Sequence, residues 1–90
     1  MPRIDFLKRA AKRLVSLPFK QRRQITVKIR ELSFSPYPND SARLKGYPFY
    51  RVDCGEYRVI YEVAGETLSI LVIGKRNDNQ VYKEMKRIYG

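Results

Sequence analysis

Ninety residues are enough for one domain, residues 1–90, with a single modest core. Nineteen Lys and Arg against nine Asp and Glu give a formal charge of +10, which attracts polyanions or an acidic protein partner. With no histidine and a single cysteine, Cys54, the chain argues against a metal site and an internal disulfide, and we expect no cofactor. No signal peptide or apolar run of about 20 residues is evident, so we expect a cytoplasmic protein that is not bound to a membrane.

The first half of the chain has a helical pattern after a short opening strand at residues 3–6. Apolar positions recur at helical spacing from Leu7, and Pro18 ends this helix and begins a second one. The second helix directs Ile25, Ile29 and Leu32 inward and its basic residues outward. The loop at residues 35–41 contains two prolines and an Asn-Asp pair, which exclude regular structure.

The second half has strand periodicity and ends in a basic helix at about residues 79–88. Tight turns fit at Cys54-Gly55 and Gly65-Glu66. The sequence therefore predicts an α+β fold: a small antiparallel sheet of three to four strands packed on two N-terminal helices, with a short C-terminal helix. The predicted strands are residues 49–53, 57–63 and 68–73, with a possible edge piece at 43–45.

The alternation of side chains along the first hairpin places Arg51, Asp53 and Arg58 on one face. This holds whether Arg58 lies opposite Arg51 or opposite Asp53. Arginine within a strand is energetically unfavourable unless an anion binds to it, so we predict that this face binds phosphate. The alternative is an ordinary exposed ion pair with Asp53 or Glu62. A turn at Gly65-Glu66 places five further residues on this face: Ile60, Glu62, Ser69, Leu71 and Ile73. The opposite face is nearly all apolar or aromatic, so we expect it to pack against the two helices. Its residues are Tyr50, Val52, Tyr57, Val59, Tyr61, Val63, Leu68, Ile70 and Val72.

Two further segments follow the last strand. Gly74-Lys75-Arg76 comes where a rigid scaffold ends, a common place for binding residues. Tyr82 lies near the start of the last helix, where it is either functional or a half-buried core tyrosine.

The order and spacing of these segments resemble the RelE branch of the RelE/ParE toxin superfamily over essentially the whole chain. The resemblance implies a helix-flanked sheet, a ribosome-dependent endoribonuclease that cuts mRNA, and a cognate antitoxin protein that wraps and neutralises the toxin. The matching segments are Lys45-Gly46, Tyr50-Arg51-Val52, Gly55 to Val63, Gly74-Lys75-Arg76 and Val81-Tyr82.

Carried over by position, the resemblance assigns roles to individual residues. Arg58 would hold the scissile phosphate, Arg76 would act on the leaving oxygen or the transition-state charge, and Tyr82 would stack on or position the substrate. Well-known members have a second lysine where this chain has Asp53. Either Lys75 or Asp53 would then move protons. The basic residues expected to bind RNA, or simply to form a solvated basic surface, are Arg51, Lys45, Arg22, Arg23 and Lys83.

Arginine suits RNA cleavage by the substrate's own 2′-hydroxyl, because this reaction needs alignment and charge neutralisation but neither a metal nor water. A guanidinium binds two phosphate oxygens and stays charged at neutral pH. Two other functions stay open. The ParE branch inhibits DNA gyrase without nuclease action, although it generally lacks the set Arg58, Arg76 and Tyr82. A passive basic module would bind RNA without cutting it.

Overall fold

The computed structural model describes residues 3–77 and 79–90. It has the predicted α+β architecture, with two helices after a short strand, a run of strands, and a C-terminal helix. The elements are β1 (Arg3–Phe6), α1 (Lys8–Ser16), α2 (Phe19–Phe34), β2 (Ser41–Arg43), β3 (Tyr50–Cys54), β4 (Tyr57–Ala64), β5 (Thr67–Lys75) and α3 (Gln80–Tyr89).

The described strands form one five-stranded sheet in the order β1-β5-β4-β3-β2. The prediction of three to four antiparallel strands is therefore too small, and the sheet is mixed because β1 pairs in parallel with β5. The edge strand begins at Ser41 rather than at Arg43. Its start is set by a turn in which both the backbone N–H and the hydroxyl of Ser41 donate to the carbonyl of Pro38.

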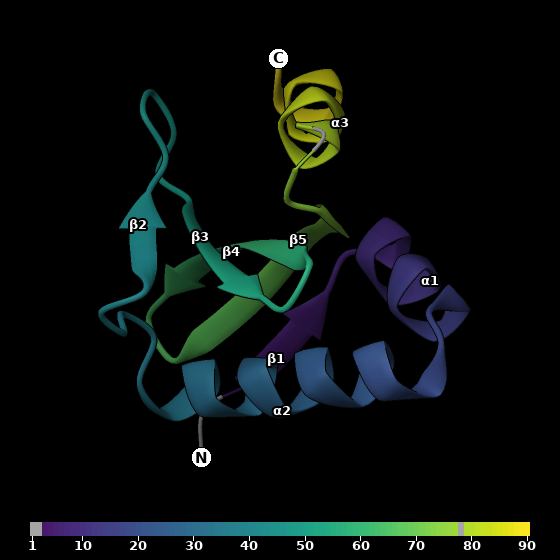
Figure 1. Ribbon diagram of the computed structural model, residues 1–90. Coiled ribbons are helices and arrows are strands. Elements are labelled where there is room, and N and C mark those ends of the chain that lie inside the picture. The colour runs from purple at the N-terminus through teal and green to yellow at the C-terminus, as the bar shows by residue number, and fades with distance from the viewer. Residues whose placement is uncertain (1–2, 78) are drawn as a thin grey trace.

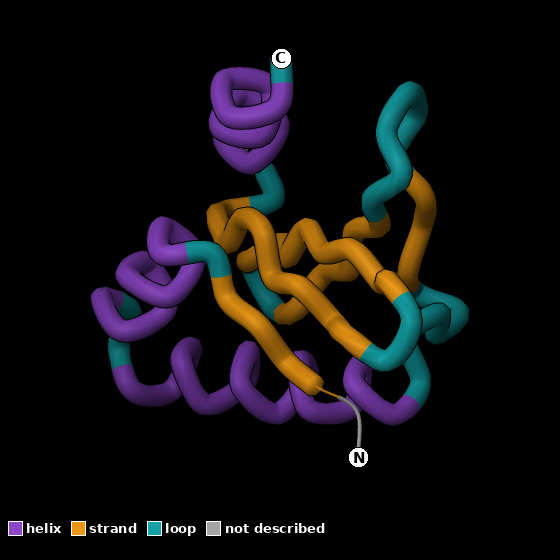
Figure 2. Tube along the Cα trace, turned by 180° about the vertical axis from the view of Figure 1, so that it is seen from behind, coloured by secondary structure: helices purple, strands orange, loops and turns teal. Residues whose placement is uncertain are grey.

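Helices cover both faces of the sheet (Figure 1). The view from behind shows the same arrangement, with α2 along one side and α3 standing on the other (Figure 2). Pro18 separates α1 from α2 as predicted, since it lies at the N-cap of α2 with an extended ψ. Within the described residues, no helix is long and apolar enough to cross a membrane.

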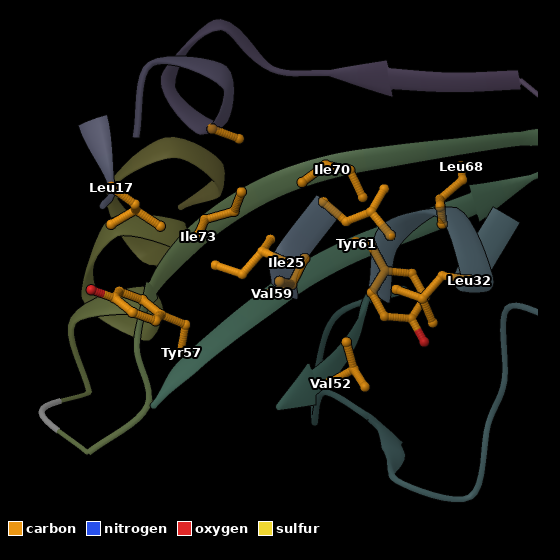
Figure 3. Packing of buried hydrophobic residues seen from close by; sticks show 12 residues of the cluster. Leu17, Ile25, Leu32, Val52, Tyr57, Val59, Tyr61, Leu68, Ile70 and Ile73 are labelled. Carbon is orange, nitrogen blue, oxygen red and sulfur yellow. The ribbon is translucent and has the colours of Figure 1, made fainter. Parts of the chain in front are cut away.

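The first core lies between the sheet and the N-terminal helices (Figure 3). Ile25, Ile29 and Leu32 of α2 are almost completely buried, as their spacing predicts. The opposite face is not left open, because α3 lies over it and encloses a second core. That second core consists of Leu44, Phe49, Ile60, Leu71, Val72, Val81 and Met85.

A bulge in β5 changes which residues face each core. Tyr61 pairs with Ile70 and Ile60 with Val72, so Leu71 is the additional residue. One extra residue reverses the alternation beyond it. The prediction is therefore wrong for two residues: Val72 joins the core under α3, and Ile73 joins the core under α1 and α2.

Candidate functional site

Arg58 on β4 lies directly opposite Asp53 on β3. Of the two registers that the sequence allows, the structure adopts this one. Nε of Arg58 donates to Oδ1 of Asp53 at 2.6 Å, and Nη2 donates to Oδ2 at 3.2 Å. The contact is a two-point pairing between a planar fork and a carboxylate, the geometry in which arginine binds an anion most strongly.

Tyr82 of α3 covers Arg58 on the side of the sheet that faces this helix. Its hydroxyl accepts a hydrogen bond of 2.6 Å from Nη1 of Arg58, and Cζ of Arg58 lies 5.6 Å from the centre of the tyrosine ring. The Arg58 side chain is only 15% exposed as a result. The ion pair foreseen as an alternative does form, but it is covered by a helix rather than spread on an open sheet.

Arg76 approaches the same carboxylate from the turn after β5. Its Nη1 lies 3.6 Å from Oδ2 of Asp53, and its backbone N–H donates to the carbonyl of Glu56 at 3.0 Å. This backbone bond ties the turn after β5 to the turn between β3 and β4. The guanidinium groups of Arg58 and Arg76 thus meet at one anionic group, although they lie 18 positions apart in the chain.

The charges in this cluster reinforce one another. Hydrogen bonding from Arg58 lowers the pKa of Asp53, against the opposing effect of burial, and the charges of Arg58, Arg76 and Arg51 lower it further. The bond to Asp53 raises the pKa of Arg58 in turn. At neutral pH the cluster is therefore one carboxylate among cations, with a net positive charge.

Gly74 lets α3 approach the sheet closely enough for Tyr82 to reach Arg58. It lies opposite Arg58 in the β4–β5 pairing. A Cβ atom added at Gly74 would lie 2.8 Å from Cγ1 of Val81, a separation that side chains do not tolerate. Here glycine provides space for a neighbouring helix, and the residue after Val81 is the tyrosine that contacts the arginine.

The structure separates Lys75 from this cluster. Lys75 pairs with Tyr57, and Tyr57 belongs to the core under the N-terminal helices. Paired residues share a face, so Lys75 leaves the sheet on the side opposite to Arg58. Arg51 lies on the same face as Asp53, two residues earlier on β3, and its charge contributes to the lowered pKa of Asp53.

The remaining predicted RNA-binding residues lie on two sides of the molecule. Lys45, in the β2–β3 connection, lines a hollow together with Tyr82, and Lys83 is exposed on α3. Arg22 and Arg23 are on α2, which covers the other face of the sheet (Figure 1).

A hollow of about 390 Å³ adjoins Tyr82 between the β2–β3 connection and α3. Two of its lining residues, Tyr47 and Lys86, were not singled out by the sequence. Tyr47 directly follows Lys45-Gly46. A basic residue and an aromatic residue on either side of a glycine are the sequence pattern by which Tyr47 could have been found. The lining residues are Leu44, Lys45, Tyr47, Tyr82, Met85 and Lys86.

The chemistry available at this site is electrostatic. Two guanidinium groups converge on one carboxylate, that of Asp53, and the hydroxyl of Tyr82 contacts Arg58 at its remaining nitrogen. The same carboxylate can accept a proton. Among the described residues there is no group of three or more His, Cys, Asp or Glu side chains that could hold a metal ion.

Comparison with known proteins shows which family the chain is similar to. The model of a family described as the ParE toxin of the type II toxin-antitoxin system parDE matches residues 4–80. The crystal structure of the isolated E. coli RelE toxin is 31% identical with a TM-score of 0.75, and the match covers 98% of this chain and 99% of that chain. No curated protein sequence matches the chain significantly.

Complexes are also among the similar structures. The archaeal RelE–RelB complex from Pyrococcus horikoshii OT3 is 30% identical with a TM-score of 0.76, and covers 86% of this chain and 97% of that chain. The intact E. coli RelBE toxin-antitoxin complex is 28% identical with a TM-score of 0.74, and covers 86% of this chain and 99% of that chain.

Proposed function

The chain belongs to the RelE/ParE superfamily of toxins of type II toxin-antitoxin systems, and we propose that it is a RelE-like endoribonuclease that cuts mRNA on the ribosome. One observation carries this proposal: Arg58 and Arg76 both contact the carboxylate of Asp53. Two arginines that can share one carboxylate can also share one phosphodiester, which presents similar paired oxygens.

The proposed reaction uses the substrate's own nucleophile. The 2′-oxygen bonds to the adjacent phosphorus and loses its proton, while the bond from phosphorus to the 5′-oxygen breaks and that oxygen gains a proton. The products are a 2′,3′-cyclic phosphate and a free 5′-hydroxyl, so atoms and charge balance without water, metal or oxidant.

Some residues at this site stabilise negative charge, and others donate or accept protons. Arg58 and Arg76 stabilise the charge that grows on the phosphorane and the leaving oxygen. The hydroxyl of Tyr82 accepts from Arg58, which leaves its own proton free to be donated to a phosphate oxygen. Asp53 accepts the proton of the 2′-hydroxyl. Its pKa is lowered by Arg58, far from neutrality, so this contribution is modest.

We also propose that this toxin acts in the cytoplasm and is neutralised by a cognate antitoxin protein. The Pyrococcus and E. coli structures contain RelE together with RelB. A net charge of +10 favours an antitoxin segment rich in Asp and Glu, and also favours docking on ribosomal RNA.

Cleavage of a translated message on purified ribosomes tests the proposal. We expect Arg58→Ala and Arg76→Ala each to reduce the cleavage rate, by roughly 10²–10³-fold for a lost charge-stabilising group. Arg9→Ala is the matched control, because it removes the same charge from an exposed position on α1. A cleavage rate for Arg58→Ala equal to that of the wild type would contradict the proposal.

Gyrase inhibition is the second candidate, because the family model that matches carries the ParE description. A DNA gyrase supercoiling assay beside the ribosome assay separates the two functions. Inhibition of supercoiling with an intact message would favour the ParE activity. Salt-sensitive RNA binding with neither effect would favour a passive basic module.

A further inference from the structure

Asp53 occupies the part of Arg58 that is best suited to an anion. The Nε and Nη2 groups form one side of the guanidinium fork, and both donate to this carboxylate. Nη1 is taken by Tyr82. The same carboxylate also meets Arg76. A phosphodiester that is to be held by both arginines therefore finds its place already filled by an internal anion.

We propose that Asp53 is an internal substitute for the substrate phosphate, which holds Arg58 and Arg76 together in the free protein and is displaced when RNA binds. This inference rests on the proposed function, because it concerns the same phosphate site. It gives Asp53 a role before the chemical step: it keeps two like charges in position until the substrate arrives.

Charge and exposure make such an exchange feasible. Without an anion between them, the two guanidinium groups would repel each other, and a side chain free to move would turn away. Asp53 prevents this while it remains reachable, since its side chain is 31% exposed and that of Arg76 is 52% exposed. The pair with Arg76 is open to solvent and contributes little free energy. Arg58 is only 15% exposed, so its bond to Asp53 is the one that phosphate must replace.

The exchange needs no rearrangement of the backbone. Asp53 and Arg58 lie on paired strands whose ladder continues through Cys54 and Tyr57. We expect rotation of the Asp53 side chain, which is 31% exposed, to clear the fork. Arg58 keeps its hydrogen bond to Tyr82 during this change, so its guanidinium plane stays in place for the incoming phosphate.

Displacement also prepares Asp53 for its proposed part in the reaction. The hydrogen bond from Arg58 is the largest cause of its lowered pKa. Once phosphate takes that bond, the pKa of Asp53 rises toward the ordinary aspartate value and the carboxylate becomes a better proton acceptor.

Binding of an RNA that cannot be cleaved tests this inference without the ribosome. The probe is a fluorescent single-stranded RNA with 2′-O-methyl groups, measured by anisotropy. We expect Asp53→Asn to bind it about tenfold more tightly, because a competing negative charge is removed from the phosphate site. The gain should disappear in the Asp53→Asn/Arg58→Ala double variant.

Asp40→Asn is the matched control. Asp40 forms an ion pair with Lys28, 2.8 Å away, so its replacement changes the total charge equally while leaving the cluster intact. Equal tightening by Asp40→Asn and Asp53→Asn would overturn the inference in favour of a general charge effect. Weaker or unchanged binding by Asp53→Asn would overturn it in favour of a purely structural ion pair.

The wild-type protein provides a second measurement that needs no variant to fold. The Nε–H signal of Arg58 is followed by NMR while the same oligonucleotide is added. We expect this signal to shift as phosphate replaces Asp53, and a signal that stays fixed at saturation overturns the inference. If Arg58→Ala alone leaves RNA binding unchanged, the proposed phosphate site is wrong. If Arg58→Ala weakens binding but Asp53→Asn has no effect, the phosphate site stands and only the role of Asp53 is wrong.

Discussion

Arg58 is held in place before any substrate is present. Asp53 fixes one side of its guanidinium group and Tyr82 fixes the other, while strand pairing fixes its backbone. A charge that is already oriented stabilises a transition state without the cost of reorganising at the moment of reaction. Arginine suits this arrangement better than lysine, because its planar guanidinium can bond Asp53 at two points and Tyr82 at a third and still keep N–H groups for another partner.

The lowered pKa of Asp53 predicts a pH-dependent contribution to stability. A carboxyl group with a depressed folded pKa stabilises the fold fully above its unfolded pKa, about 3.9, and loses this effect as the pH falls through the folded value. At pH 7 we expect Asp53→Asn to be less stable than wild type by about 0.5–1 kcal/mol, a small value because solvent screens the pair.

Urea unfolding at pH 7 and at pH 3 measures this difference. Asparagine does not titrate at that position, so the variant provides the baseline. We expect the two proteins to become more nearly equal in stability at pH 3. A difference that stays the same at both pH values would show that the ion pair is not the origin of the effect.

At the scale of elements, α3 completes the site and covers the second core. Val81 and Met85 pack on Ile60 and Val72 of the sheet. Tyr82, next to Val81, carries the contact to Arg58. The packing of Val81 therefore controls the position of Tyr82, and Gly74 controls how closely α3 approaches the sheet.

Gly74→Ala is expected to push α3 away from the sheet. The new methyl group would lie 2.8 Å from Cγ1 of Val81, a buried β-branched side chain with little freedom to move. Overpacking of this kind costs about 1–3 kcal/mol. We expect a loss in the free energy of unfolding, measured in urea, together with reduced cleavage as Tyr82 moves from Arg58.

Val81→Ala provides the partner for a double-mutant cycle. It removes the clashing atom, so Gly74→Ala should cost less in that background, with a coupling energy of about 1 kcal/mol or more. An equal cost in both backgrounds would mean that close packing against Val81 is not the reason for glycine.

At the scale of the whole molecule, basic residues lie on both faces of the sheet. Arg58 lies on the face of the sheet that α3 covers, whereas Arg22, Arg23 and Arg30 belong to α2, which covers the other face (Figure 1). Under the proposed function, a single RNA strand bound at Arg58 does not also need to reach α2. The charge on α2 therefore suits a partner larger than the substrate strand, such as folded RNA around it.

Salt dependence distinguishes the basic residues on the two faces. Arg22→Ala and Arg23→Ala should each weaken ribosome binding, with the slope of log K against log salt reduced by about 1 per lost phosphate contact. The cut sites on the message should stay the same, because these residues lie away from the cluster. Measurement of ribosome binding at several salt concentrations, with mapping of cut sites, tests this. Unchanged slopes would leave α2 as a solvated surface.

Sequence periodicity was sufficient for much of this structure. The α2 face with Ile25, Ile29 and Leu32 follows from helical spacing alone. The shared face of Asp53 and Arg58 follows from strand alternation, since both permitted registers preserve it. Val72 and Ile73 were misplaced, because the bulge at Leu71 has no signature in a run of apolar residues.

The sequence by itself determined the elements, the strongly positive charge and the face on which the hairpin arginines lie, because these depend on local spacing and composition. Only the tertiary structure decided that Arg76 reaches Asp53 and Tyr82 reaches Arg58, and that Lys75 lies on the other face. Those outcomes depend on pairing between distant strands and on the close approach of α3 at Gly74. Contacts between separate elements are set by packing across the whole fold, which local periodicity does not contain.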